Sequence, residues 1–307
     1  MYNKTTAAFK SSNGVNDIAY YVYRPQNPKA MIQLVHGMCE YLERYEPFID
    51  FLTDNGFLVY GCDHLGHKGS VSSDEDLGYM AHENGWKCLI KDQRTLNRMM
   101  KEENPGLKCF LYGHSMGSFV SRAYAARFPE DFDGVIFTGT SGANPSTGIA
   151  EVLIKLNIKF KGERNHSGLI TTLMFAGYNK RYKNPTTAYD WLSRDEKVVR
   201  EYIEDPYCGF MFTSSAYLDL INLIKDVTSD SWYNRIAVDL PVLFLGGTMD
   251  PVGNWGEGLK EIDAKMKRRE RTDYDMILFE DMRHELHNEI GKEMVYDKVV
   301  NWINERL

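Results

Sequence analysis

Six short apolar runs, separated by helical stretches, constrain the fold more than any other feature of this sequence. They lie at 31–37, 56–63, 107–115, 133–140, 240–250 and 274–280. Continuous apolar runs of this length are typical of strands buried on both faces of a parallel sheet. The helical patterns between them include 41–56, 83–106 and 118–132. The sequence therefore predicts a doubly wound, mostly parallel α/β sheet with right-handed crossovers.

Two regions depart from this alternation. Residues 5–11 and 16–24 read as short strands joined by turn residues, which predicts a hairpin at the sheet edge. From 144 to 233 the chain has only helical patterns and loops. We therefore expect a core formed by 1–143 and 234–307, interrupted by a mainly helical cap at 144–233.

Composition restricts the partners and the compartment. The 307 residues are 43% hydrophobic, as in a packed protein, and their net charge of −7 disfavours nucleic acid as a partner. The five cysteines are an odd set without a C-x-x-C pair, which indicates free thiols in a reducing compartment. The sequence shows no apolar leader and no run of about 18 apolar residues. We expect a soluble, cytoplasmic protein.

A glycine-flanked serine stands between a predicted strand and a predicted helix. Residues 113–117 read G-H-S-M-G, directly after the apolar run CFLY and before the helical stretch SFVSRAYAARF. A serine at such a turn adopts a strained backbone, and the glycines prevent collisions with neighbouring backbone. The pattern also arises by chance in glycine-rich turns, but this placement favours Ser115 as a catalytic nucleophile.

A nucleophilic serine needs a histidine that accepts its proton. Where the serine follows a strand in this way, the acid and then the histidine come later in the chain, which leaves His166, His284 and His287. His166 lies in a polar loop of the expected cap. His284 follows the last predicted strand by a short loop, and His287 lies at the expected start of the final helix. We expect His284 to be the base, with His287 as the alternative.

The acid should lie at the end of a late strand, where it can accept a hydrogen bond from the imidazole. Asp250 ends the run LFLGGTMD, although an aspartate before Pro251 is also a common turn residue. Residues 284–287, H-E-L-H, suggest zinc as a competing interpretation. Their spacing is one residue short of H-E-x-x-H, so we expect neither a metal nor a cofactor.

Backbone N–H groups must stabilise the negative charge that develops on the substrate oxygen. One should come from Met116, the residue after the nucleophile, and one from the loop after an earlier strand. His36 and Gly37 end the run at 31–37, and the glycine permits close approach to the oxyanion. The N–H groups of Met38 and Met116 are therefore the expected oxyanion hole.

These motifs together resemble those of the monoacylglycerol lipase and lysophospholipase group of α/β hydrolases, sometimes classed with serine aminopeptidase-like hydrolases. The similar segments are 34–48, 63–70, 112–118, 246–253 and 283–289. The resemblance implies the α/β hydrolase fold and a pocket-shaping loop at 63–70. It also implies the roles given above: oxyanion donors Met38 and Met116, nucleophile Ser115, acid Asp250 and base His284.

One helical pattern in the cap bears on membrane contact. Its apolar residues recur at helical spacing, with basic residues between and after them: Ile149, Val152, Leu153, Leu156 and Phe160. Such a stripe either packs on the domain below or touches a lipid surface transiently. We expect packing, because most apolar helical stripes belong to the core. In both cases the cap would roof an apolar pocket, which favours an acyl chain.

The leading hypothesis is hydrolysis of a small-molecule acyl ester, such as a monoacylglycerol or a lysophospholipid, through an acyl-enzyme. An aminopeptidase-like peptidase is the second hypothesis, and it needs acidic cap residues facing Ser115, for which Glu201, Glu204 and Asp205 are candidates. The third is a ligand-binding protein without activity, against which the complete set of catalytic residues argues. The sequence leaves the oligomeric state open.

Overall fold

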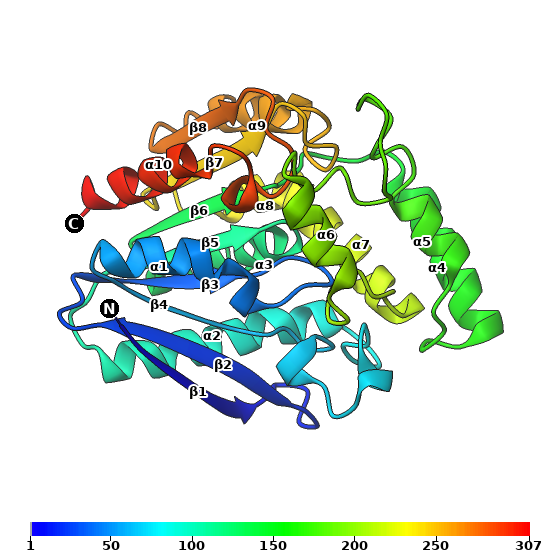
Figure 1. Cartoon of the computed structure of the whole chain (residues 1–307), viewed down its shortest axis with the longest axis horizontal. Helices are drawn as coiled ribbons and strands as arrows, with labels where there is room; N and C mark the ends of the chain where they lie inside the picture. Colours follow the sequence, from blue (N-terminus) through cyan, green and yellow to red (C-terminus); the bar gives the residue numbers. More distant parts are fainter. Residues whose placement is uncertain (1) are drawn as a thin grey trace.

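The computed structural model describes residues 2–307, and one eight-stranded sheet runs through them in the order β1-β2-β4-β3-β5-β6-β7-β8 (Figure 1). The strands are β1 (Tyr2–Lys10), β2 (Asp17–Pro25), β3 (Ala30–Val35), β4 (Phe57–Cys62), β5 (Cys109–His114), β6 (Gly134–Thr138), β7 (Val242–Gly247) and β8 (Tyr274–Phe279). β1 and β2 form the expected edge hairpin, β2 pairs antiparallel with β4, and the other pairs are parallel. The predicted mostly parallel sheet is confirmed.

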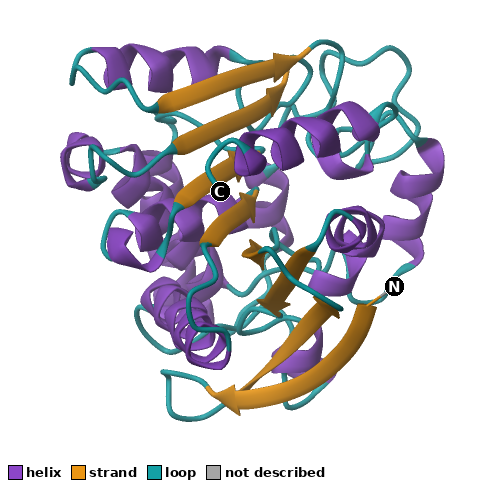
Figure 2. Ribbon diagram, turned by 90° about the vertical axis from the view of Figure 1, so that its left-hand side faces the viewer, coloured by secondary structure: helices purple, strands orange, loops and turns teal. Residues whose placement is uncertain are grey.

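Helices cover both faces of this sheet (Figure 2). α1 (Glu46–Asp54) and α10 (Lys292–Asn304) pack on one face, and α2 (Gly85–Glu103), α3 (Met116–Ala125) and α9 (Glu257–Lys267) pack on the other. Successive side chains of a strand point to opposite faces. Leu111 of β5 accordingly joins the core with α2 and α3, whereas Phe110 and Tyr112 join the core with α1 and α10. Burial on both faces explains why the strands read as continuous apolar runs.

Between β6 and β7 the chain forms a helical segment. Its helices are α4 (Thr147–Lys161), α5 (Gly168–Met174), α6 (Glu196–Glu204), α7 (Ser214–Thr228) and α8 (Asp230–Arg235). α7 contacts α2 and α3, and Trp232 of α8 donates its indole N–H to the carbonyl of Arg122 at 2.8 Å. The second half of the segment therefore packs on helices that cover the sheet, and the expected boundary at 233 falls within α8.

The apolar stripe of α4 does not pack as expected. Ile149 is 70% exposed and Phe160 is 75% exposed, and the other members, Val152, Leu153 and Leu156, are exposed as well. α4 instead buries the side that carries Ala150, Ile154 and Ile158, next to α7. The prediction of packing is wrong because helical spacing identifies which residues share a face, but not whether another element covers that face.

The sheet order changes direction at β3, which places the candidate site. The chain passes from β3 to β4 on one side of β3 and returns to β5 on its other side. Ligands of open α/β sheets bind outside the carboxyl ends of the strands at such a point. Residues 36–38 follow β3 and Ser115 follows β5, so these two segments meet there: a Cβ on Gly37 would lie 3.1 Å from the Cβ of Ser115.

Candidate active site

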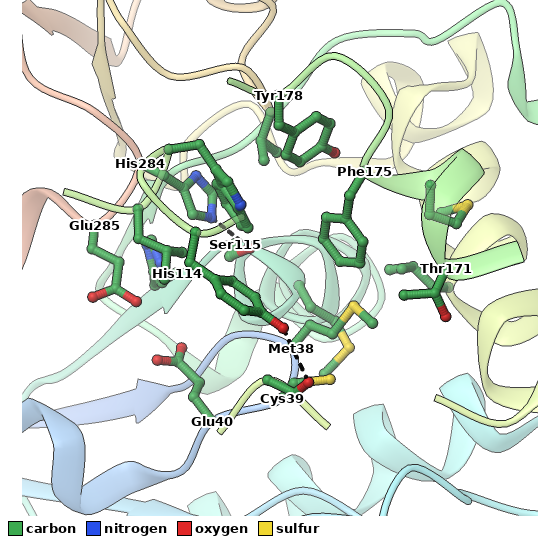
Figure 3. A pocket seen from close by; sticks show the side chains of 18 of the residues that line it. Met38, Cys39, Glu40, His114, Ser115, Thr171, Phe175, Tyr178, His284 and Glu285 are labelled. Atoms are coloured by element: carbon green, nitrogen blue, oxygen red, sulfur yellow. Dashed lines mark hydrogen bonds between the residues drawn. The ribbon is translucent and has the colours of Figure 1, made fainter. Parts of the chain in front are cut away.

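Ser115 occupies the sharp turn between β5 and α3. Its backbone has φ 53° and ψ −123°, a conformation that costs energy for any residue other than glycine. Gly117 makes the turn possible, because a Cβ there would lie 2.2 Å from the carbonyl oxygen of Val35. The strained turn directs the Ser115 side chain into a pocket, as Figure 3 shows.

His284 and Asp250 lie in line with this serine. The Nε2 atom of His284 is 2.8 Å from the Oγ atom of Ser115, and its Nδ1 atom is 3.0 Å from Oδ1 of Asp250. Asp250 also accepts the backbone N–H of Val252 at 2.8 Å. Because His284 and Asp250 are buried, water does not compete for these contacts. The imidazole can thus accept the serine proton while the carboxylate holds the opposite ring nitrogen.

The charges around His284 favour its protonated form. Burial by itself would lower the pKa of His284, but the charge and hydrogen bond of Asp250 raise it above its usual value of 6.5. The carboxylates of Glu285 and Glu40 act in the same direction. The neighbouring ring of His114, with its centroid 4.7 Å from that of His284, has a pKa well below the usual value because it is buried beside other histidines. Within this group the pKa of His284 is raised, whereas that of His114 is lowered.

The alternative base, His287, lies elsewhere in the cluster. Its ring stacks on Tyr45 with centroids 4.2 Å apart, and neither ring nitrogen has a hydrogen-bond partner among residues 2–307. Burial lowers its pKa to about 3. It lies in a short 3-10 turn, and the final helix begins only at Lys292, after Gly291 at φ 87°, so the expected helix start at 287 is wrong. In the described part of the chain, no three His, Cys, Asp or Glu side chains are arranged to hold a metal ion.

Met38 and Met116 both line the pocket next to Ser115. In residues 2–307 neither backbone N–H has a hydrogen-bond partner. The turn before Met38 is held from within, because the N–H of Gly37 donates to Oε1 of Glu40 at 2.5 Å. Both N–H groups therefore remain available as hydrogen-bond donors.

The loop at 63–70 supports this turn. The N–H of Cys39 donates to Nε2 of His67 at 3.2 Å, and the N–H of His64 donates to Nε2 of His36 at 2.9 Å. Asp63 accepts the backbone N–H of residue 42 at 3.0 Å. Cys39 itself is buried, and burial raises the pKa of its thiol well above the usual value. The loop thus shapes the site by fixing the backbone of the neighbouring turn.

A cavity of about 140 Å³ opens beside Ser115. Phe175 and Tyr178 border it in Figure 3. Most of its other walls are apolar, including Phe119, Met174, Leu220, Ile224 and Val252. The acidic residues of the helical segment that a peptidase would need do not line it: Glu201, Glu204 and Asp205. The wall is suited to an acyl chain.

Sequence reasoning missed an ion triad beside the site, in which one arginine binds two buried glutamates. Arg44 contacts Glu40 at 2.5 Å and Glu285 at 3.0 Å. The spacing of Glu40 and Arg44, four residues apart, was a usable signal for the first pair. Glu285 comes from a segment 241 residues away, which no local pattern reveals.

The fold and the site geometry together define an α/β hydrolase with a serine, histidine and aspartate in line. The chain belongs to the family described as "Serine aminopeptidase, S33", whose model matches residues 26–291. This match and two similar lipases together confirm the resemblance to the monoacylglycerol lipase group.

Both relatives are 26% identical to this chain. One is a monoacylglycerol lipase of Mycolicibacterium smegmatis, matched over 98% of this chain and 97% of that protein. The other is a monoglyceride lipase of Mus musculus, matched over 91% of this chain and 84% of that protein. Among solved structures, a thermostable carboxyl esterase from Bacillus coagulans is similar at a TM-score of 0.92, with 26% identity and 98% of each chain covered. A lipase in its open form is similar at a TM-score of 0.90, with 25% identity and 99% of each chain covered.

Proposed function

We propose that this protein hydrolyses carboxylic esters of lipids with one acyl chain, such as monoacylglycerols or lysophospholipids. The observation that carries the proposal is the continuous contact from Ser115 through His284 to Asp250, at 2.8 Å and 3.0 Å, next to an apolar cavity. The similar proteins are named as lipases or a carboxyl esterase, which supports an ester as the substrate.

In the proposed reaction Ser115 attacks the ester carbonyl while His284 takes the serine proton. The N–H groups of Met38 and Met116 stabilise the oxygen that becomes negative. His284 then gives its proton to the departing alcohol, which leaves an acyl group on Ser115. Water, deprotonated by His284, attacks this acyl group, releases the fatty acid and restores the serine. Asp250 stays ionised throughout and keeps the imidazole oriented.

The same proposal divides the chain by role. Residues 1–143 and 234–307 would form the core that carries the catalytic residues, and residues 144–233 would form a cap over the acyl chain. α5 supports this division, since Thr171 and Met174 line the cavity. A peptidase is less well supported, because Asp205 is already engaged by the hydroxyl of Tyr41 at 2.6 Å and lies outside the cavity wall.

Ser115→Ala tests the proposal directly. We expect the turnover of p-nitrophenyl esters to fall by at least about three orders of magnitude, and labelling by a fluorophosphonate probe to be lost. Ser146→Ala, on the exposed start of the helical segment, is the matched control and should keep both. Aminoacyl anilides in place of the esters test the peptidase alternative. Retention of ester hydrolysis by Ser115→Ala would remove this serine from the mechanism.

We also propose that an exposed surface of the cap touches lipid transiently. This α4–α5 surface consists of the exposed apolar residues Ile149, Val152, Leu153, Leu156, Phe160, Leu169 and Leu173. The exposed Lys155, Lys159 and Lys161 lie among the α4 members, as in helices that bind anionic membranes. α4 and α5 lie at the outer edge of the molecule in Figure 1, and within residues 2–307 no helix is long and apolar enough to cross a bilayer.

Cosedimentation with vesicles of phosphatidylcholine and phosphatidylglycerol tests this surface. Replacing Leu156 and Phe160 together by serine should weaken vesicle binding and leave the hydrolysis of soluble esters unchanged. Val15→Ser with Val238→Ser is the matched control, because these residues are 75% and 69% exposed but lie outside the α4–α5 surface. Equal vesicle binding by both variants would contradict lipid contact. If the parent and the control form a dimer without lipid and the Leu156 and Phe160 variant does not, the partner of this surface is a second copy of the chain.

A further inference from the structure

An arginine whose side chain is only 10% exposed joins the two loops that would carry out the chemistry. One terminal nitrogen of Arg44 lies 2.5 Å from Glu40 and 3.0 Å from Glu285, and the other lies 3.0 Å from the second oxygen of Glu285. We propose that Arg44 is a positioning residue for ester hydrolysis. It holds the oxyanion turn, residues 36–38 after β3, and the His284 loop, residues 280–285 after β8, at the spacing that the reaction requires. This inference rests on the proposed function.

Glu40 connects Arg44 to the oxyanion turn by hydrogen bonds. Its Oε2 atom contacts Arg44, while its Oε1 atom accepts the N–H of Gly37 at 2.5 Å and the hydroxyl of Tyr45 at 2.6 Å. Gly37 directly precedes Met38, the proposed oxyanion donor. A displacement of the Glu40 carboxylate would therefore move that N–H relative to Ser115.

Glu285 connects Arg44 to the loop that carries His284. It directly follows His284, and its side chain is tied to Arg44 by two parallel hydrogen bonds and to Asn288 at 2.9 Å. Its backbone N–H donates to the carbonyl of Leu192 at 2.8 Å. Glu40 and Glu285 lie on the same side of the pocket in Figure 3, away from Phe175 and Thr171.

An arginine is suited to this place because both carboxylates are buried. Two buried carboxylates would repel each other, and one planar guanidinium can bind both at once. Burial raises the pKa of Glu40, whereas the charge of Arg44 holds the pKa of Glu285 at about 2 in spite of burial. Removing Arg44 would leave the two acids without their cation.

The two carboxylates that bind Arg44 also contribute to the charge around His284. The carboxylates of Asp250, Glu285 and Glu40 raise the pKa of this histidine. The other titratable groups beside it are His114 and His287, and burial lowers the pKa of both. Glu285 is ionised at neutral pH, so replacing it by glutamine removes a negative charge next to the base.

Arg44→Lys is the first test, with p-nitrophenyl butyrate as the probe. Lysine keeps the charge but has one nitrogen and cannot bind both carboxylates in the same way. We expect kcat to fall about tenfold to a hundredfold with little change in KM. The matched control is Arg127→Lys, which breaks a similar two-bond pair with Asp226, 3.0 Å in both contacts, beyond the far end of α3. Its kcat should equal that of the parent.

Glu285→Gln is the second test, and it decides the question if Arg44→Lys does not fold. We expect the acid limb of kcat/KM to move to lower pH by about half a unit or more, because a negative charge beside His284 is lost. A purely structural role would lower the melting temperature without moving this limb. Unchanged kcat in folded Arg44→Lys, or an unmoved limb in Glu285→Gln, would overturn the role of Arg44. A parent protein without hydrolysis or probe labelling would instead refute the proposed function.

Discussion

Replacing Asp250 by asparagine keeps His284 in place but changes the group that orients it. This variant therefore tests whether the carboxylate of Asp250 orients the proposed base. Oδ1 of Asp250 accepts from Nδ1 of His284 at 3.0 Å and also from the N–H of Val252 at 2.8 Å. Asparagine has one oxygen and one NH₂ group, so only one of its two orientations keeps an acceptor at the position of Oδ1, and in the other orientation the NH₂ group faces Nδ1 of His284. The ring would then carry its proton on Nε2, which faces Ser115, and could no longer accept the serine proton.

The size of the effect follows from the geometry. Coulomb's law with an effective dielectric constant of about 20 gives about 5.5 kcal/mol between the carboxylate and a protonated imidazole at 3.0 Å. Each 1.36 kcal/mol of barrier corresponds to about a factor of ten in rate. Asp250→Asn should therefore lower kcat by about four orders of magnitude. Removing the charge also lowers the pKa of His284, so the acid limb should move to lower pH.

The assay is the hydrolysis of p-nitrophenyl butyrate, with kcat and KM measured from about pH 5 to 9. Asp226→Asn is the matched control, because it changes the same functional group in the pair with Arg127, away from the site. Thermal unfolding shows whether each variant is folded. A folded Asp250→Asn that keeps more than about a tenth of the parent kcat would refute the idea that this carboxylate orients the base.

Two further predictions concern the pH profile and the serine turn. In the parent, kcat/KM should rise with pH through one ionisation above 6.5, because neutral His284 is the proposed base and the charge of Asp250 raises its pKa. A profile that is flat from about pH 5 to 8 would contradict this. Gly117→Ala should destabilise the fold by about 1–3 kcal/mol or more and lower activity, because the new Cβ would lie 2.2 Å from the carbonyl oxygen of Val35. Gly148→Ala, where a Cβ meets no atom within 4 Å, should leave denaturant unfolding nearly unchanged.

Local patterns were sufficient to predict the fold, and they singled out most of the residues of the proposed site. Strands buried on both faces must be apolar throughout, so the six runs predicted the sheet directly. The turn after β5 needs glycine at 117 because the backbone of Val35 is so close, and this made Ser115 recognisable. Chain order then reduced eight histidines to three candidates, and distance to the last strand favoured His284.

The sequence by itself therefore determined the sheet, the helical segment and the family, since each depends on residues that are close together in the chain. Only the tertiary structure decided whether the α4 stripe is covered, what surrounds His287, and that Arg44 joins Glu40 to Glu285. Periodicity reports which side chains share a face, whereas coverage of that face and pairing of buried charges depend on segments that folding brings together from distant positions.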